Sequence, residues 1–357
     1  MIYLDNQATT PLAPEAREAM LRWLGGPDSE TFGNPHSPHR LGRTAKAAVE
    51  VAREQVAALF PAGGRVVFTG SACEAINLAI RGAPGDGPMA LSTIEHAAVY
   101  DTTKALGRGH YLSVDSAGVC QPDQDLPDGT SLVAVMQVNN EIGTVQPVDQ
   151  WAAKAHAAGA LMLCDAVQGA GKLAPPQDAD LIVVSAHKLY GPKGIGALWV
   201  RDGVTLTPQI TGGLQEGLRS GTLNPALCAG FGAAARLAAE QMAQDNTHAR
   251  SLFDRALELF AGWTVNGSMT ERNFANFSIR KDGLDVARLM SDCRDIMFSA
   301  GSACASGSGK PSHVLTAIGL SPAEAKSAIR LGFGRYTTME ELEQAVAMIK
   351  GAAATQE

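Results

Sequence analysis

Short apolar runs alternate with helix-like stretches over the first two thirds of the chain. The apolar runs have the length and composition of buried strands, and they cover residues 66–69, 132–138, 161–164, 181–184 and 197–200. The stretches 45–59, 75–81 and 148–158 have the composition and spacing of helices. Strands that alternate with helices pair in parallel and carry helices on both faces of the sheet, so this part of the sequence predicts an α/β fold.

The pattern changes after about residue 225. A long alanine-rich helix is expected over about 226–260. Shorter elements follow it, namely strands at 274–279, 296–299 and 329–333, and helices at 284–293 and from Met339 onward. This mixture predicts a second, smaller α+β domain. Within it, residues 300–311 form the only low-complexity stretch, made almost wholly of Gly, Ser and Ala around Cys304.

Composition and charge exclude several classes of protein. The chain has 357 residues, of which 45% are hydrophobic, so we expect a globular protein with room for two domains. Its 29 basic and 36 acidic side chains give a net charge of −7 without any basic run, which argues against binding to nucleic acid or to an anionic membrane surface. No apolar run approaches the roughly 18 residues of a membrane span, and the N-terminus carries no export signal, so we expect a cytoplasmic protein.

The six cysteines are scattered along the chain, at positions 73, 120, 164, 228, 293 and 304. No two of them have the Cys-x-x-Cys spacing of a structural zinc site, so we expect reduced thiols and no metal. Cys304 stands apart because the small residues around it make a segment flexible enough to carry a thiolate between two positions. We expect the other five cysteines to be inert packing residues.

Unusual polar residues follow the ends of four predicted strands. They are Asn139, Asn140 and Glu141 after 132–138, Asp165 and Gln168 after 161–164, Ser185, His187 and Lys188 after 181–184, and Thr69 to Cys73 after 66–68. In an open parallel sheet, ligands bind beyond the carboxyl ends of the strands. We therefore expect these side chains to share one pocket.

The chemistry of this set meets the needs of pyridoxal phosphate. The small-residue turn at 70–73 opens a helix whose N–H groups favour a phosphate. Asp165 can keep a pyridine nitrogen protonated, and Lys188 can form a Schiff base with an aldehyde. Each group alone has an ordinary explanation: a solvated lysine, an aspartate that caps a helix, or a core histidine at His96. Only their combination between apolar strands indicates a cofactor site.

Sequence motifs in a fixed order extend over nearly the whole chain. They cover residues 3–11, 33–37, 94–96, 138–143, 165–168, 185–196, 219–224, 301–304 and 329–335. The Ser-Ala-His-Lys segment at 185–188 and the Gly-Ser-Ala-Cys segment at 301–304 are the most specific. On these residues the chain resembles the cysteine desulfurases of the NifS/IscS type, within the class V aminotransferase group of fold-type I enzymes.

The resemblance implies a fold and a reaction. It implies a large domain over 15–235 with a mostly parallel seven-stranded sheet that binds pyridoxal phosphate, and a small domain from 1–14 and 236–357 that carries a mobile cysteine loop at about 300–311. It implies a homodimer that converts L-cysteine to L-alanine and passes sulfur to an acceptor protein, in iron–sulfur cluster assembly or other sulfur trafficking. The alternatives are a class V aminotransferase or a selenocysteine lyase on the same fold, and a non-catalytic binding protein that keeps the fold.

The resemblance also implies roles for single residues. Lys188 would form the Schiff base and move protons, and His96 would stack on the ring and relay protons. The other cofactor contacts would be Asp165 to the pyridine nitrogen, Asn140 and Gln168 to the ring oxygen, Ser71, Ala72, Cys73, Ser185 and His187 to the phosphate, and Thr222 to the phosphate in the neighbouring subunit. Arg330 and Asn34 would bind the substrate carboxylate. Cys304 would be the nucleophile that becomes a persulfide.

The sequence departs from the family pattern at two places. Cys73 occupies a position where the family commonly has threonine, and a thiol donates a weaker hydrogen bond than a hydroxyl. We expect a phosphate to be held less tightly there unless Ser71 substitutes. The chain stops at Glu357, whereas housekeeping members continue into a tail that helps to dock the iron–sulfur scaffold protein, so the identity of the sulfur acceptor stays open.

Overall fold

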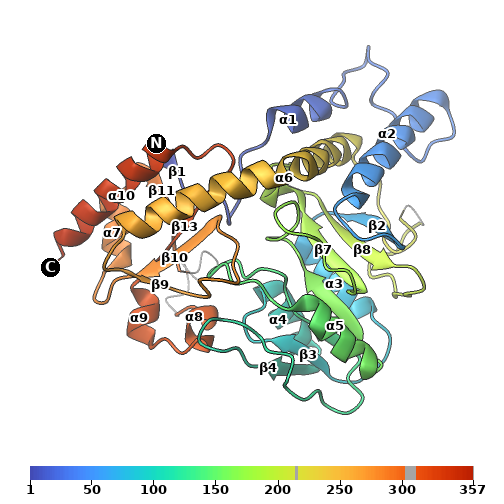
Figure 1. Ribbon diagram of the computed structural model, residues 1–357. Helices are drawn as coiled ribbons and strands as arrows, with labels where there is room; N and C mark the ends of the chain where they lie inside the picture. Colours follow the sequence, from blue (N-terminus) through green and yellow to red (C-terminus); the bar gives the residue numbers. More distant parts are fainter. Residues whose placement is uncertain (214–215, 302–310, 357) are drawn as a thin grey trace.

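The computed structural model describes residues 1–213, 216–301 and 311–356, and the larger part of these residues is built on a seven-stranded sheet (Figure 1). The strands are ordered β2 (Gly64–Thr69), β8 (Gly196–Arg201), β7 (Leu181–Ser185), β6 (Leu161–Asp165), β5 (Leu132–Ala134), β3 (Met89–Ser92) and β4 (Gly109–Leu112). Neighbours pair in parallel except β8, which is antiparallel to both β2 and β7. The predicted α/β fold with a mostly parallel sheet is confirmed.

The reversed direction of β8 follows from the length of its connection. Only residues 186–195 join β7 to β8. A parallel crossover needs roughly a dozen or more residues, usually with a helix. The connecting segment is shorter than this, so β8 lies antiparallel beside β7. The connection contains Lys188, which therefore lies at the carboxyl edge of the sheet.

Helices cover both faces of this sheet. Alternate residues of a strand point to opposite faces, and in β2 the side chains of Val66 and Phe68 belong to one apolar core while Val67 belongs to another. The first core contains residues of α1 (Pro14–Leu21), α2 (Arg40–Ala57), α5 (Val148–Ala157) and the first half of α6 (Pro225–Leu259). The second core contains residues of α3 (Ala72–Gly82) and α4 (Ala97–Ala105).

A four-stranded antiparallel sheet forms the centre of the smaller part. Its strands are ordered β12 (Ser299–Ala300), β13 (Ala328–Gly332), β10 (Asn276–Arg280) and β9 (Thr264–Val265). Its apolar core takes residues from α7 (Val286–Asp292), from α10 (Met339–Ala354) and from the second half of α6. The short helices α8 (His313–Ala317) and α9 (Pro322–Lys326) precede β13. The predicted long helix and the predicted α+β character of this part are both confirmed.

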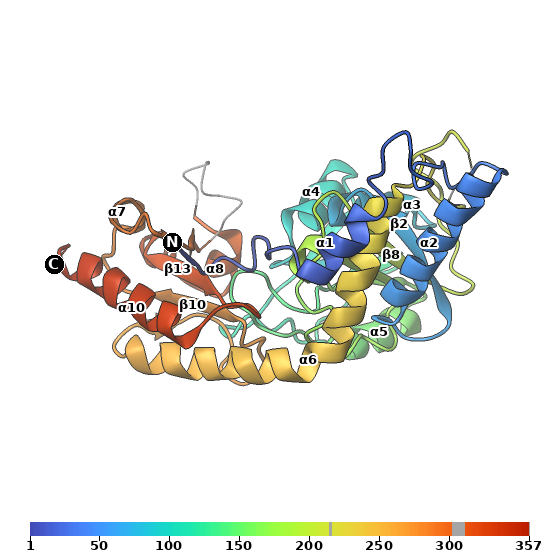
Figure 2. The ribbon, with the colours of Figure 1, turned by 90° about the horizontal axis from the view of Figure 1, so that it is seen from above.

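Two segments connect the larger and smaller parts. The first segment is helix α6, which runs along both parts of the molecule (Figure 2). Its first and second halves contribute to different apolar cores. The start of the chain joins the smaller part, because β1 (Ile2–Tyr3) pairs in parallel with β11 (Ile296–Met297). The expected domain boundary between residues 235 and 236 falls inside α6 and stays a prediction. None of the described helices is both long and apolar enough to cross a membrane.

The hydrophobic pattern does not reveal four elements of the larger part, namely β3, β4, α1 and α4. It also extends one strand too far, because β5 ends at Ala134 and not at Val138. The reason is a buried carboxyl group: the Met136 N–H donates to Glu95 Oε1 at 2.7 Å and not to a neighbouring strand. Glu95 thus ends the pairing between β5 and β3, while Val135 and Gln137 still donate to carbonyls of β6.

Candidate active site

A pocket of about 460 Å³ lies at the carboxyl edge of the seven-stranded sheet. It gathers most of the residues that the sequence singled out: Ser71, Ala72, Cys73, His96, Asn140, Asp165, Gln168, Ser185, His187, Lys188 and Arg330. The expectation that the strand ends share one pocket is confirmed. Their roles in binding and catalysis stay predictions.

The order of the strands sets the layout of the pocket. Ser71 follows β2 at one edge of the sheet, Lys188 follows β7, Asp165 ends β6, Asn140 follows β5, and His96 follows β3. The small-residue turn and His96 therefore lie on opposite sides of the pocket, with Asp165 and Lys188 between them. A flat ligand with an anionic group at one end fits this order.

Lys188 closes a single 3₁₀ turn, η1 (Ala186–Lys188). Its Nζ donates to two backbone carbonyl oxygens of the N-terminal segment, Gln7 O at 2.5 Å and Ala8 O at 2.8 Å. Gln7 O also accepts from Gln168 Nε2 at 2.9 Å. These two bonds to backbone oxygens hold the amine in the pocket.

A strained residue fixes the backbone next to Lys188. Tyr190 is the one non-glycine residue with positive φ in the described chain, at 68°, and such a conformation costs on the order of 1–3 kcal/mol. Its N–H donates to Thr10 Oγ1 at 2.7 Å, and its hydroxyl accepts from the Arg335 N–H at 2.6 Å. The Arg335 guanidinium lies 4.4 Å from the centre of its ring. These contacts from two other segments hold the strained conformation in place.

Asp165 is the carboxylate at the centre of the pocket. Its side chain is buried, and its Oδ1 accepts from the Val167 N–H at 2.9 Å. Burial raises the pKa of Asp165, while His96, the Val167 N–H and Lys188 all act in the opposite direction. A cationic ring nitrogen beside this carboxylate would gain a buried ion pair with a hydrogen bond.

A second carboxyl group, Glu95, lies behind the pocket and is almost fully buried. Burial raises the pKa of Glu95 well above its usual range, and the nearby Asp165 raises it further. Burial therefore disfavours the charged form of Glu95, whereas His96, the Val167 N–H and Lys188 favour the charged form of Asp165. Next to it, His96 caps α4 by accepting the Ala98 N–H on Nδ1 at 3.1 Å, so a neutral His96 carries its proton on Nε2.

The small-residue turn before α3 is held by its own capping bonds. Ser71 Oγ accepts from the Glu74 N–H at 3.2 Å, and Glu74 Oε2 accepts from the Gly70 N–H at 2.7 Å. The other oxygen of Glu74 binds Arg219 Nε at 2.7 Å. A Cβ on Gly196 would lie 2.8 Å from Ala72 N, so only glycine lets β8 pass directly behind the turn. The turn is thus a rigid site for an anion at the start of an 11-residue helix.

His187 lies beside this turn and is uncharged near pH 7. Burial lowers the pKa of His187 to about 4, and the positive charges of Lys188 and Lys193 add to this effect. Its Nδ1 is 3.1 Å from Thr9 Oγ1. His187 is therefore a neutral hydrogen-bonding group that lines the pocket near pH 7.

We expect His187 to make the folded state less stable as the pH falls from 6.5 to about 4. In this window the unfolded chain protonates the histidine while the folded chain does not, so protons favour unfolding. Urea unfolding of the wild type and of His187→Gln across this range measures the effect. The free energy of unfolding should fall more steeply for the wild type, and equal slopes for the two proteins would contradict the assignment.

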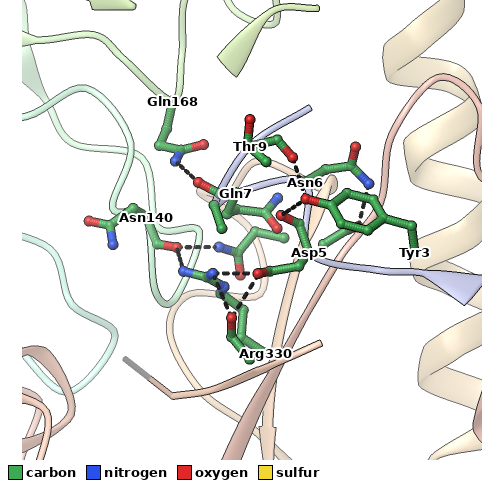
Figure 3. Close-up of polar contacts among 12 residues, drawn as sticks. Tyr3, Asp5, Asn6, Gln7, Thr9, Asn140, Gln168 and Arg330 are labelled. Carbon is green, nitrogen blue, oxygen red and sulfur yellow. Dashed lines mark hydrogen bonds and ion pairs between the residues drawn. The ribbon is translucent and has the colours of Figure 1, made fainter. Parts of the chain in front are cut away.

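Arg330 borders the pocket from β13, and only 1% of its side chain is exposed. Its Nη2 binds Asp5 Oδ1 at 2.8 Å, and its Nη1 donates to Asn140 O at 2.9 Å (Figure 3). The same view shows Gln7 and Gln168 joined beside this pair. A segment of the larger part, the start of the chain and a strand of the smaller sheet therefore meet at one arginine.

Three predicted site residues are not in the described pocket. Asn34 is exposed, and its Oδ1 accepts from the His36 N–H at 2.9 Å. Thr222 is also exposed and does not line the pocket. Cys304 lies outside the described residues.

Four of the remaining cysteines, at positions 120, 164, 228 and 293, are buried as expected. Burial raises the pKa of Cys120 to about 12 and that of Cys164 well above its usual value, so both stay protonated thiols. Cys73 is different, because it is exposed and lines the pocket. The expectation that all five are packing residues is wrong for Cys73, since a thiol in the first turn of α3 faces the pocket and not the core.

The sequence interpretation gave no role to the N-terminal segment, although it matched a motif at 3–11. The structure places the Gln7 and Ala8 carbonyls against Lys188, and Asp5 against Arg330. Such contacts carry no signal of their own in a sequence, because two of the three groups belong to the backbone. The motif at 3–11 is the one feature of the sequence that points to a role for this segment.

Comparison with known families agrees with this geometry. The family model described as "Aminotransferase class-V" matches residues 2–345. The chain belongs to this family. Among its relatives are proteins named cysteine desulfurase IscS from Colwellia psychrerythraea, 40% identical over 98% of this chain and 92% of that relative, and from Vibrio cholerae, 40% identical over 98% and 92%. A solved structure titled "NIFS-LIKE PROTEIN" has a TM-score of 0.90 and 30% identity, and covers 99% of both chains.

The pocket fits pyridoxal phosphate, the cofactor of class V aminotransferases. Lys188 offers an amine for its aldehyde, and Asp165 offers a buried carboxylate for its ring nitrogen. The capped turn at Ser71 offers a helix N-terminus for its phosphate, on the side of the pocket away from His96. The order of the strands thus suits a ring with its phosphate at one end.

Proposed function

We propose that this protein is a pyridoxal-phosphate-dependent cysteine desulfurase, which converts L-cysteine to L-alanine and hands the sulfur to an acceptor. The observation that carries the proposal is the gathering of Lys188, Asp165, His96 and Arg330 in one pocket. An amine, a carboxylate and an imidazole serve the cofactor, and a guanidinium serves an amino-acid substrate. The relatives named cysteine desulfurase, about 40% identical over nearly the whole chain, support the choice of substrate.

Each residue of the pocket has a defined task in this reaction. When bound, pyridoxal phosphate supplies an electron sink for the bonds of the substrate α-carbon. Lys188 takes up the α-proton, and Arg330 holds the carboxylate so that this proton faces the amine. His96 Nε2 exchanges a proton with the substrate on the far side of the pocket from the small-residue turn. Cys304 attacks the substrate sulfur as a thiolate and leaves with it as a persulfide.

The proposal includes a homodimer. Thr222 and Asn34 are exposed on a single chain, although the family pattern gives them contacts with phosphate and substrate. A second subunit packed against these segments would bring them to a pocket. The charged fraction of only 18% is consistent with a large covered surface.

The sulfur acceptor is proposed only as a class: a protein that takes sulfur from a persulfide, such as a scaffold for iron–sulfur clusters. We also propose a cytoplasmic location, because the five cysteines of the described residues are reduced thiols. Selenocysteine presents the same carboxylate and amine to the pocket, so a selenocysteine lyase remains the alternative on this fold.

The test is formation of L-alanine from L-cysteine without any keto acid, together with mass spectrometry of the protein afterwards. A desulfurase forms alanine and gains one sulfur atom on a single peptide. An aminotransferase forms no alanine under these conditions and needs an added keto acid. Alanine without bound sulfur would count against a persulfide on the protein.

A further inference from the structure

Arg330 is a buried cation whose charge is already balanced before any substrate binds. Its side chain is 1% exposed, and it binds Asp5 Oδ1 at 2.8 Å. A buried guanidinium without a counter-ion is costly, so the ion pair stabilises the free protein. A substrate carboxylate that approaches Arg330 therefore meets a neutral pair and not a free positive charge.

Asp5 is held firmly in this position. Ser299 Oγ donates to the same Oδ1 at 2.9 Å and lies 3.4 Å from Arg330 Nη2. The backbone of Asp5 forms a bridge with Gly332 on β13, and the Tyr3 hydroxyl donates to Thr9 O at 2.7 Å across the turn that follows (Figure 3). These contacts are all between described residues of the chain itself.

One other carboxyl group acts on Arg330. Glu141 is buried, and its Oε2 accepts a hydrogen bond from the Ser312 hydroxyl. Burial raises the pKa of Glu141 to about 7, while Ser312, Arg330 and His96 favour its charged form. Near pH 7 Glu141 is charged only part of the time, whereas Asp5 contacts the guanidinium directly. Asp5 is thus the main counter-ion of Arg330 in the described chain.

We propose that Asp5 is an internal counter-ion that limits the affinity of the pocket for amino-acid carboxylates, by neutralising Arg330 in the free enzyme. The substrate carboxylate shares the guanidinium with Asp5, and the repulsion between the two anions weakens binding. Weak binding keeps the pocket from retaining its product, L-alanine, which carries the same carboxylate as the substrate. This inference rests on the proposed function for the identity of the ligand. Asp5 is not one of the residues to which the family pattern gives a contact with the cofactor.

The experiment compares the wild-type holoenzyme with Asp5→Asn. An asparagine keeps an oxygen that can accept from Arg330 Nη2 and from Ser299, but it removes the negative charge. We expect Asp5→Asn to bind L-alanine about tenfold more tightly, as the Coulomb energy of two anions near one cation implies. The dissociation constant follows from titration of the holoenzyme absorbance, and KM for L-cysteine should fall in parallel while kcat changes much less. Cysteamine, which has no carboxylate, should bind both proteins equally.

A second readout does not depend on turnover. Without ligand, Asp5→Asn should unfold at a lower temperature than the wild type, because Arg330 is left without its counter-ion. L-Alanine should raise that temperature more for the variant than for the wild type. Ser299→Ala is the matched control, since it removes a contact of the same oxygen but no charge, and its affinity for L-alanine should stay within about twofold of the wild type.

The outcomes separate the possibilities. Weaker binding of L-alanine by Asp5→Asn would overturn the proposal and make Asp5 a residue that positions Arg330; unchanged binding would also overturn it. If Asp5→Asn does not fold, Asp5→Ser, a second neutral variant, is expected to show the same tighter binding. If the proposed desulfurase function is wrong, the wild type will form no alanine from L-cysteine. The titration with L-alanine tests the role of Asp5 independently of that result.

Discussion

Lys188→Ala is expected to lose alanine formation from L-cysteine by a factor on the order of 10⁴ or more. The amine of Lys188 lies in the pocket, held by the Gln7 and Ala8 carbonyls, and alanine offers neither a nucleophile nor a base there. The two bonds that the variant loses are to backbone carbonyls, and we expect it to fold. Steady-state alanine formation and the absorbance of the purified protein measure the loss.

Two further variants show whether the amine itself is responsible. Lys188→Arg keeps the positive charge and the ability to donate to both carbonyls, but a guanidinium neither forms the bond to an aldehyde nor takes up a proton at neutral pH. Lys188→Arg should be as inactive as Lys188→Ala. Lys193 also lines the pocket and provides a second amine for comparison. Lys193→Ala should keep most of its activity, and a loss as large as that of Lys188→Ala would contradict the assignment of the reactive lysine.

The pocket could be predicted from the sequence because its residues sit at the ends of apolar runs. Asp165 ends β6 and Lys188 follows β7, two five-residue strands whose residues are nearly all buried, so the hydrophobic pattern fixes where each polar group emerges. Parallel strands bring those points to one edge. The connection from β7 to β8 is too short for a crossover helix, and this keeps Lys188 at the same edge although β8 is reversed.

Other features have no signal in a single pattern of apolar and polar residues. Glu95 ends the pairing of β5 with β3 by accepting the Met136 N–H, and no feature of residues 132–138 indicates that a carboxyl group 41 residues earlier will do so. The strands β3 and β4 have only four residues each, so their patterns are too short to distinguish from loops. The ion pair of Asp5 with Arg330 joins positions 325 residues apart.

The described residues that flank Cys304 in the sequence also make long-range contacts. The described residues on both sides of the segment 302–310 adjoin the pocket. On one side, Ser299 contacts Asp5 beside Arg330. On the other, Ser312 donates to Glu141, and His313 Nε2 lies 3.0 Å from Glu95 O, next to His96. The described flanks of this segment therefore both lie near the pocket.

Cys304→Ala is expected to keep the cofactor absorbance but to gain no sulfur atom from L-cysteine, and to lose alanine formation by a factor on the order of 10³ or more. The thiolate is the group that accepts the substrate sulfur, and alanine has no atom that can do so. Mass spectrometry of peptides after addition of L-cysteine measures bound sulfur, and an alanine assay measures turnover. Cys73→Thr is the matched control, because Cys73 is the exposed cysteine of the described pocket and threonine restores the residue that the family commonly has there. It should still acquire sulfur on the Cys304 peptide, and sulfur found on the Cys73 peptide of the wild type would mean that the nucleophile has been misassigned.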